Sequence, residues 1–336
     1  MPTWGEILLE LNQSATARGG LPDFDAIRRK YLAQLAALTG RDTIIYYSDW
    51  LAGGVPQTAI TLEDVQGMME VCTGMHGAGL DLLIHSPGGS AEDTASIVRY
   101  LRGRYGHIRA FVPLAAMSAA TMWALAGDTI VMGAHSQLGP IDPQVLPVTG
   151  GRYVPARAIV EQFERAKEEC KDDPAALGAW LPILQQYGPS LIAECEDAEQ
   201  MSKRLVKDWL ASYMFKGAED AHERAQAVAD YFGDYTQHRS HSLGIDRDTA
   251  RKAGVEKIED LESDPALQDA VLSVHHATLH TLSGPAVKIV ENHLGRAFVK
   301  LTQQFAVPTI QLAPEQAGGS PPLVSPAQPG LPSQPT

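Results

Sequence analysis

The feature that most constrains the fold is a repeated alternation of short apolar segments with amphipathic ones between residues 42 and 133. Three of the apolar segments read DTIIYYSDW, LDLLIHS and HIRAFVP, and each is followed by a segment whose apolar residues have helical spacing. Nearly continuous apolar strands separated by helices are typical of a mainly parallel sheet covered by helices on both faces. We therefore expect an α/β domain with buried strands.

Helical spacing predominates on both sides of this alternation. Helices are expected over residues 24–38, 155–171, 175–186, 189–214, 218–231, 265–282 and 286–304. The last segment, from Ala313, is rich in Pro, Gly, Ser and Gln and has too little apolar surface to offset the entropy of ordering. The predicted organisation is a helical segment over 1–40, an α/β domain over 41–263, a helical region over 264–306 and a disordered tail over 307–336.

Composition and charge exclude several classes of protein. The 336 residues are 44% hydrophobic and 20% charged, which is enough for a sizeable core, and the net charge of −13 disfavours nucleic acid and anionic membranes as partners. No apolar run approaches the ~18 residues that would span a bilayer. Cys72, Cys170 and Cys195 contain no CxxC pair, and the first residues lack the pattern of a signal peptide. We expect a cytoplasmic protein without membrane insertion.

Two strand ends carry residues suited to one reaction. Gly88 and Gly89 follow the second strand, where glycines let backbone N–H groups turn toward a ligand, and Ser118 follows the third strand at the start of a helix. Each feature has an ordinary explanation, a tight turn or an N-cap serine. Because consecutive parallel strands end at the same edge of a sheet, together they place a hydroxyl beside backbone donors, as acyl transfer requires.

The segments LLIHSPGGSAEDTASIVRYLR, AAMSAATMWALAGDTIVMG and HSQLGPIDPQ resemble the Clp-fold serine peptidases, closest to the SDH (serine dehydrogenase proteinase) family and related to the signal peptide peptidases. The resemblance extends from about residue 40 to residue 294. It implies a Clp/crotonase-like α/β spiral of mainly parallel strands with added N- and C-terminal helices. It also implies Ser118 as nucleophile, an oxyanion hole from the backbone of Gly88, Gly89 and Ala119, and a homo-oligomer.

The implied activity is a serine endopeptidase that acts on protein or peptide substrates through an acyl-enzyme and needs no cofactor. No GxxxxGK[ST] motif occurs in the chain, so ATP hydrolysis is not expected from it. Two alternatives stay open. One is a crotonase-type acyl-CoA lyase or hydratase, which stabilises an enolate with similar N–H groups, and the other is a catalytically silent scaffold with the same fold.

The sequence leaves the general base open. Clp proteases carry a histidine after the elbow helix, and the resemblance puts Ile141 or Asp142 near that position, with His135 several residues earlier. Signal peptide peptidases use a lysine further along the chain, where this sequence has Lys167 and Lys171. We name His135 and Lys171 as first candidates. The other candidates are Lys167, Lys288, His238 and His241.

Histidine spacing raises the question of a metal site. His276 and His280 are four residues apart and share a helix face, with His275 and His293 nearby. There is no HExxH motif, and no carboxylate completes a ligand set. We expect no metal and interpret these histidines as positions in a helix core or an interface. Asp142, before Pro143, fits a turn as well as a catalytic position.

Overall fold

The computed structural model describes residues 3–51, 56–146 and 151–302. They lie within one compact unit, Met1–Thr302. The elements predicted in the helical segment, the α/β domain and residues 264–302 therefore pack together. The tail predicted over 307–336 lies outside the described residues.

A seven-stranded sheet forms the centre of the unit, in the order β10-β5-β3-β2-β1-β11-β12. Its strands are β1 (Asp42–Ser48), β2 (Gly79–His85), β3 (His107–Val112), β5 (Thr129–Met132), β10 (Ile258–Asp260), β11 (Ala286–Asn292) and β12 (Ala297–Leu301). The five strands from β10 to β1 pair in parallel, and β11 and β12 add antiparallel pairs at one edge. The predicted mainly parallel sheet is confirmed.

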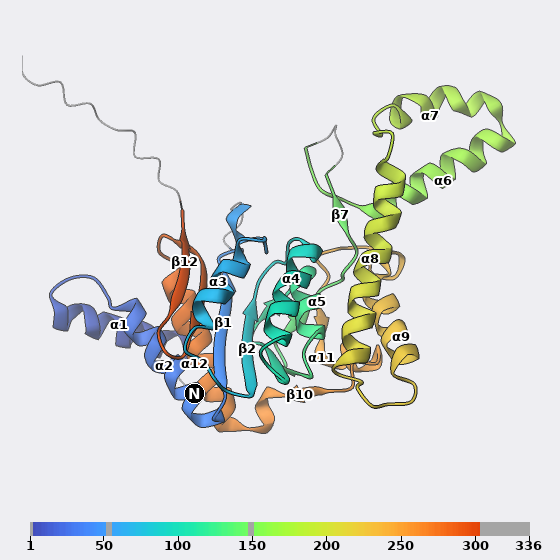
Figure 1. Cartoon of the computed structure of the whole chain (residues 1–336). Coiled ribbons are helices and arrows are strands. Elements are labelled where there is room, and N and C mark those ends of the chain that lie inside the picture. Colours follow the sequence, from blue (N-terminus) through green and yellow to red (C-terminus); the bar gives the residue numbers. More distant parts are fainter. Residues whose placement is uncertain (1–2, 52–55, 147–150, 303–336) are drawn as a thin grey trace, which may run out of the picture. The chain divides into compact units, whose positions relative to one another are not determined.

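Helices cover both faces of this sheet (Figure 1). On one side lie α3 (Asp64–Val71), α4 (Ala91–Arg102), α5 (Ala119–Leu125), α8 (Leu191–Ser212) and α9 (Ala221–Gly233). On the other side lie α1 (Trp4–Arg18), α2 (Phe24–Thr39) and α12 (Pro265–Leu282). Strand β1 shows why the two cores form, because side chains alternate along a strand. Ile44 and Tyr46 contribute to the first core, and Ile45 and Tyr47 contribute to the second.

Two small sheets lie beside the large one. The first has the order β4-β6-β9, from β4 (Ala115–Ala116), β6 (Gln137–Leu138) and β9 (Ile245–Asp246). The second is the antiparallel pair β7 (Gln144–Val145) and β8 (Val154–Pro155). In the first sheet, β4 runs parallel to β6, and β9 runs antiparallel to it.

The remaining helices complete the chain. They are α6 (Ala156–Asp172), α7 (Leu177–Leu184), α10 (Tyr235–His238), α11 (Arg247–Lys252) and the 3-10 turns η1 (Pro56–Thr58), η2 (Pro174–Ala176) and η3 (Leu261–Ser263). Helix α6 packs on the first half of α8 through a small apolar cluster that includes Ile159, Val160 and Cys195. In Figure 1, α6 and α7 lie beyond the end of α8, away from the sheet.

One predicted element is wrong. The helix predicted over residues 286–304 is not present in its described part, residues 286–302, because Ala286–Asn292 and Ala297–Leu301 form the antiparallel strands β11 and β12. The segment is rich in β-branched residues, and Gly295 at φ +85° supplies the turn between the strands. Strand β11 is fully buried and pairs with β1. This burial stabilises the strand, although the apolar residues of the segment also fit helical spacing.

Candidate active site

Ser118 occupies the sharp turn between β4 and α5. Its backbone has φ +52° and ψ −123°, a conformation that a residue with a Cβ rarely adopts. The next residues, Ala119 and Ala120, are small and buried, which lets the chain turn closely. The half-buried Ser118 hydroxyl makes no hydrogen bond to any residue that the structure describes. A strained serine between a strand and a helix is typical of a nucleophile elbow.

The glycine loop after β2 runs directly beside this elbow. Two backbone hydrogen bonds join the loops, from the Ser86 N–H to the Ala115 oxygen (3.2 Å) and from the Met117 N–H to the Ser86 oxygen (3.0 Å). Gly88 has φ +96°, and a Cβ there would lie 2.6 Å from the Met117 oxygen and 2.8 Å from the Ser118 Cβ. Only glycine fits this approach. The two loop tips that the sequence singled out are therefore in contact.

The backbone donors beside Ser118 are not equivalent. The N–H of Gly88 already donates to Ser86 Oγ at 3.2 Å. The N–H groups of Gly89 and Ala119 donate to no acceptor within the described residues. Gly89 is fixed by Ile60, whose N–H donates to the Gly88 oxygen (2.7 Å) and whose oxygen accepts from the Ser90 N–H (3.1 Å). Gly89 and Ala119 thus each present an N–H beside the elbow that no described residue accepts.

A histidine and an aspartate form a pair near the same loops. His241 Nδ1 lies 2.8 Å from Asp142 Oδ1, and the other Asp142 oxygen accepts from Gln144 Nε2 at 2.7 Å. The Asp142 side chain is only 3% exposed, whereas His241 is 26% exposed and open to solvent on one side. A buried carboxylate that holds one ring nitrogen leaves the other nitrogen of the imidazole available.

The register of the β4-β6-β9 sheet places this pair relative to Ser118. Ala116 pairs with Leu138, and Leu138 pairs with Ile245. Ser118 follows β4, Asp142 follows the parallel strand β6, and His241 precedes the antiparallel strand β9. All three therefore lie beyond the same end of this sheet.

Contacts between the strands hold this end of the sheet together. A Cβ on Gly139, one residue past β6, would lie 3.3 Å from the Met117 Cα. The Gly139 N–H donates to Thr121 Oγ1 (2.9 Å), and that hydroxyl donates to the Ala116 oxygen (2.7 Å). The segment that leads to Asp142 is thus fixed against the Ser118 elbow.

The first two base candidates lie elsewhere. His135 precedes β6, so the parallel β4-β6 ladder separates it from Ser118, and its Nε2 lies 2.9 Å from the Pro113 oxygen. Lys171 is exposed near the end of α6, 3.7 Å from a Glu168 oxygen. Lys167 is likewise exposed and pairs with Glu164. The structure brings none of them into a hydrogen bond with Ser118 within its described residues.

The two other candidates have structural partners. Lys288 is fully buried, with its Nζ 2.7 Å from Asp64 Oδ2 and 2.7 Å from the Ala59 oxygen. Burial lowers the pKa of Lys288, and the charge of Asp64 opposes that change. His238 is buried with its Nε2 2.7 Å from the Tyr231 oxygen. His241 is the candidate that has a buried carboxylate partner and also lies beyond the end of the β4-β6-β9 sheet where Ser118 turns.

His241 and Asp142 were each named as candidates from the sequence, but their interaction was not predicted. They are 99 residues apart, and Asp142 also fitted a turn before Pro143. The available signal was indirect, because Asp142 occupies the position after the elbow helix where the resemblance places a catalytic residue. The partner could be chosen only once β9 was known to pair with β6.

His85 ends β2 immediately before the glycine loop. Its ring is fully buried among Tyr47, Trp50 and His275, at 5.5 to 5.7 Å between ring centroids, and neither ring nitrogen has a hydrogen-bond partner in the described part of the chain. Burial lowers the pKa of His85 to about 4. The ring is therefore neutral at neutral pH and supports the loop from the opposite side of the sheet.

The histidines weighed as metal ligands do not form a site. Among the described residues, no group of three or more His, Cys, Asp or Glu side chains is arranged to hold a metal ion. His280 packs on the Trp4 ring at 3.7 Å and lies 3.1 Å from the Trp4 oxygen. A search of the described helices for one long and apolar enough to cross a membrane finds none.

Sequence comparison identifies relatives without a described activity. An uncharacterised protein of Methanocaldococcus jannaschii is 30% identical over 214 residues, which are 62% of this chain and 68% of that protein. A second uncharacterised protein of the same organism is 33% identical over 163 residues, or 46% of this chain and 54% of that protein. The chain thus spans about half the length of the second relative.

Solved structures give weaker matches. A serine-to-alanine mutant of the 1510-N membrane-bound stomatin-specific protease has a TM-score of 0.34 and 16% identity, covering 60% of this chain and 74% of that one. A lysine-to-alanine mutant of the same protease in complex with a substrate peptide has a TM-score of 0.35 and 17% identity, covering 60% and 70%.

The family match covers the part of the chain that holds the elbow, the glycine loop and the His241–Asp142 pair. The profile of the ClpP-like SDH-type serine proteinases matches residues 54–273, more than half of the sequence. This confirms the resemblance noted from the motifs and the expected ClpP-like fold. The chain belongs to the family of ClpP-like SDH-type serine proteinases.

Proposed function

We propose that the protein is a serine endopeptidase in which Ser118 is the nucleophile, His241 is the general base and Asp142 orients His241. The observation that carries the proposal is the His241–Asp142 hydrogen bond of 2.8 Å at the end of the sheet where Ser118 forms a strained elbow. A serine hydroxyl is a weak nucleophile until a positioned base accepts its proton. This base replaces His135 and Lys171, the first candidates from the sequence.

We expect the reaction to use the His241–Asp142 pair and the Ser118 hydroxyl in the following steps. The Nδ1–H of His241 donates a hydrogen bond to Asp142, so the lone pair of the ring is on Nε2. Nε2 accepts the proton of the Ser118 hydroxyl as Oγ bonds to the substrate carbonyl carbon. The C–N bond of the tetrahedral intermediate then breaks, and His241 returns the proton to the leaving amine. In the second half of the reaction, His241 accepts a proton from a water molecule as its oxygen bonds to the acyl carbon, the bond from that carbon to Ser118 Oγ breaks, and His241 returns the proton to Oγ.

The N–H groups of Gly89 and Ala119 are proposed to bind the oxyanion. Both are free of other acceptors within the described residues and flank the Ser118 turn. Gly88 then serves a different purpose, because its N–H is bound to Ser86 Oγ and its lack of a Cβ lets the loops touch. Loss of one such donor typically raises the barrier by ~2.7–4 kcal/mol.

Hydrolysis of unfolded protein tests this proposal. We expect the full chain to cleave a casein-like substrate without ATP, and we expect Ser118→Ala and His241→Ala to lower kcat by on the order of 10⁴-fold. Asp142→Asn should also lower kcat strongly, because an amide does not hold His241 in the required tautomer. His222→Ala, an exposed histidine on α9, is the matched control and should retain full activity.

Equal cleavage by the wild type and Ser118→Ala would reject the serine mechanism. Turnover of acyl-CoA thioesters without peptide cleavage would favour the crotonase-type alternative. Absence of both activities in a folded wild type would favour the silent scaffold.

We also propose a cytoplasmic location and a homo-oligomer. Cys72, Cys170 and Cys195 are all free thiols, which suits a reducing compartment. Self-association is supported by α7, whose sequence LGAWLPIL is apolar although none of its side chains is buried in a single chain. Sedimentation velocity tests it, because Leu181→Asp should lower the mass of the particle if α7 lies between copies.

A further inference from the structure

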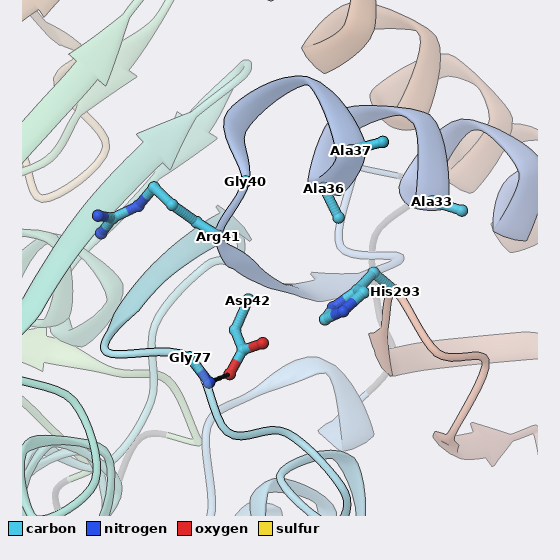
Figure 2. A pocket seen from close by; sticks show the side chains of 8 residues that line it. All are labelled: Ala33, Ala36, Ala37, Gly40, Arg41, Asp42, Gly77 and His293. Carbon is cyan, nitrogen blue, oxygen red and sulfur yellow. Dashed lines mark hydrogen bonds between the residues drawn. The ribbon is translucent and has the colours of Figure 1, made fainter.

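A cavity of about 350 Å³ lies at the edge of the sheet opposite the active site. It opens between the end of α2, the start of β1 and the loop before β2, whereas Ser118 follows the opposite, carboxyl ends of the parallel strands. Figure 2 shows Asp42 and His293 directed toward the same space, with Ala33 and Ala37 on the adjacent helix. The proposed peptidase mechanism uses none of these residues.

The carboxylate of Asp42 has no counter-ion among the residues that the structure describes. The residue is 8% exposed, and its Oδ2 accepts from the Gly77 N–H (2.8 Å) and the Tyr105 hydroxyl (3.2 Å). Within the described residues Oδ1 accepts no hydrogen bond, and no basic nitrogen lies within 4.0 Å of either oxygen. Buried carboxylates are normally paired, because removal from water without a partner is costly.

The basic residues around the cavity do not supply the missing charge. Arg41 lines the cavity, but its guanidinium points away from Asp42 (Figure 2) and binds Asp81 Oδ1 at 2.6 Å. The Nδ1 of His293 accepts from the Thr43 N–H at 3.2 Å. In its neutral form His293 therefore carries its proton on Nε2.

The wall opposite the carboxylate is apolar. Ala33 and Ala37 are four residues apart on α2 and share one face of the helix, and both are exposed. Gly77 also lines the cavity and lies directly against Asp42, because a Cβ at this position would be 2.9 Å from the Asp42 Cγ. The cavity therefore combines one unpaired negative charge with a short apolar surface, at the small end of the range for ligand pockets.

We propose that this cavity binds an organic cation, an ammonium or guanidinium group on a short aliphatic stem. The charged group lies on Asp42 Oδ1, and the stem lies against Ala33 and Ala37. A metal ion is a poorer fit because only one carboxylate is present and metals need several ligands. An anion would be repelled by Asp42. The cation comes either from a free amine or from a Lys or Arg side chain of a second copy of the chain.

Methyl NMR of the full chain with ¹³C-labelled alanine tests the proposal, with n-butylammonium and agmatine as probes. We expect saturable shifts of the Ala33 and Ala37 methyl signals, no such shifts with butan-1-ol, and binding at least ten-fold weaker in Asp42→Asn. Asp172→Asn, an exposed carboxylate at the end of α6, is the matched control and should bind as the wild type does. Ala37→Leu fills the cavity without changing its charge and should also weaken binding at least ten-fold.

Sedimentation velocity distinguishes the two sources. If the cation is a side chain of a second copy, Asp42→Asn and excess n-butylammonium both lower the mass of the assembled protein. If it is a free amine, the mass is unchanged while the methyl signals still move. Absence of saturable shifts in the wild type, or equal binding by the wild type and a folded Asp42→Asn, would overturn the proposal.

Discussion

At the scale of single residues, the contact between Gly88 and the Ser118 turn sets the geometry of the candidate site. In Gly88→Ala, the new Cβ would lie 2.6 Å from the Met117 oxygen at a φ of +96°. We expect the free energy of unfolding to fall by about 2 kcal/mol or more, and peptide cleavage to fall with it. Urea denaturation measures the first effect.

Gly106→Ala is the control for that substitution, because nothing lies within 4 Å of its Cβ position. Its stability should change by less than about 1 kcal/mol. Equal stabilities for the two variants would mean that the loops do not approach each other as closely as described.

The buried ring of His85 makes stability depend on pH. The pKa of His85 is about 4 in the folded protein and 6.5 without burial. A lowered histidine pKa means that the unfolded chain takes up the proton first, so this ring does not reduce stability well above pH 6.5 and reduces it progressively as the pH falls toward 4. The loss from this ring is about 3 kcal/mol at pH 4.

Urea denaturation between pH 7 and pH 4 checks this prediction. His85→Phe should show a shallower decline than the wild type, although His275, whose pKa is lowered by burial, still contributes in the same direction. His222→Phe, on the surface of α9, should decline as the wild type does. Identical slopes for all three proteins would contradict the account of the His85 ring.

At the scale of elements, a buried ion pair joins α3 to β11. Lys288 and Asp64 are both 0% exposed and 2.7 Å apart, and Asp64 also accepts from the Tyr46 hydroxyl at 2.8 Å. Lys288→Met removes the nearer of the two cations beside Asp64 and leaves Lys300 Nζ at 3.6 Å, so the free energy of unfolding should fall by about 3 kcal/mol. Thermal or urea unfolding measures this fall in the free energy of unfolding.

The double variant Lys288→Met with Asp64→Asn should regain part of that stability, because the unpaired charge is then removed. This result separates the ion pair from a simple packing effect. If the double variant is less stable than Lys288→Met by the full cost of Asp64→Asn alone, the two side chains do not interact.

The elements also show what a sequence can predict. Strands β1, β2, β3 and β5 and the helices between them were predicted because each is an uninterrupted apolar or amphipathic run with its own turn signals, whereas the two-residue strand β4 was not predicted. Residues 286–304 were assigned to a helix because Val287, Val290 and Leu294 also fit helical spacing. Their strand form depends on burial against β1, a contact with a segment more than two hundred residues earlier that no local pattern encodes.

At the scale of the whole molecule, the candidate site depends on long-range pairing. Ser118 and the glycine loop could be predicted because they lie in the strand-to-helix connections that follow β3 and β2, two neighbouring parallel strands of the large sheet. The proposed base could not be predicted, since Asp142 and His241 meet only when β9 pairs with β6, after the chain has passed through helices α6, α7, α8 and α9. The resemblance to other peptidases instead led to His135 and Lys171 as first candidates, which are nearer to Ser118 in sequence and lie elsewhere in the structure.

Labelling by a fluorophosphonate probe tests the central claim most directly, with the modified residue located by peptide mass spectrometry. The account predicts modification of Ser118 in the wild type and in His222→Ala, none in Ser118→Ala, and a rate at least on the order of 10²-fold lower in His241→Ala, because the hydroxyl loses its base. Modification of Ser118→Ala to the same extent as the wild type, or labelling of His241→Ala at the wild-type rate, would contradict it.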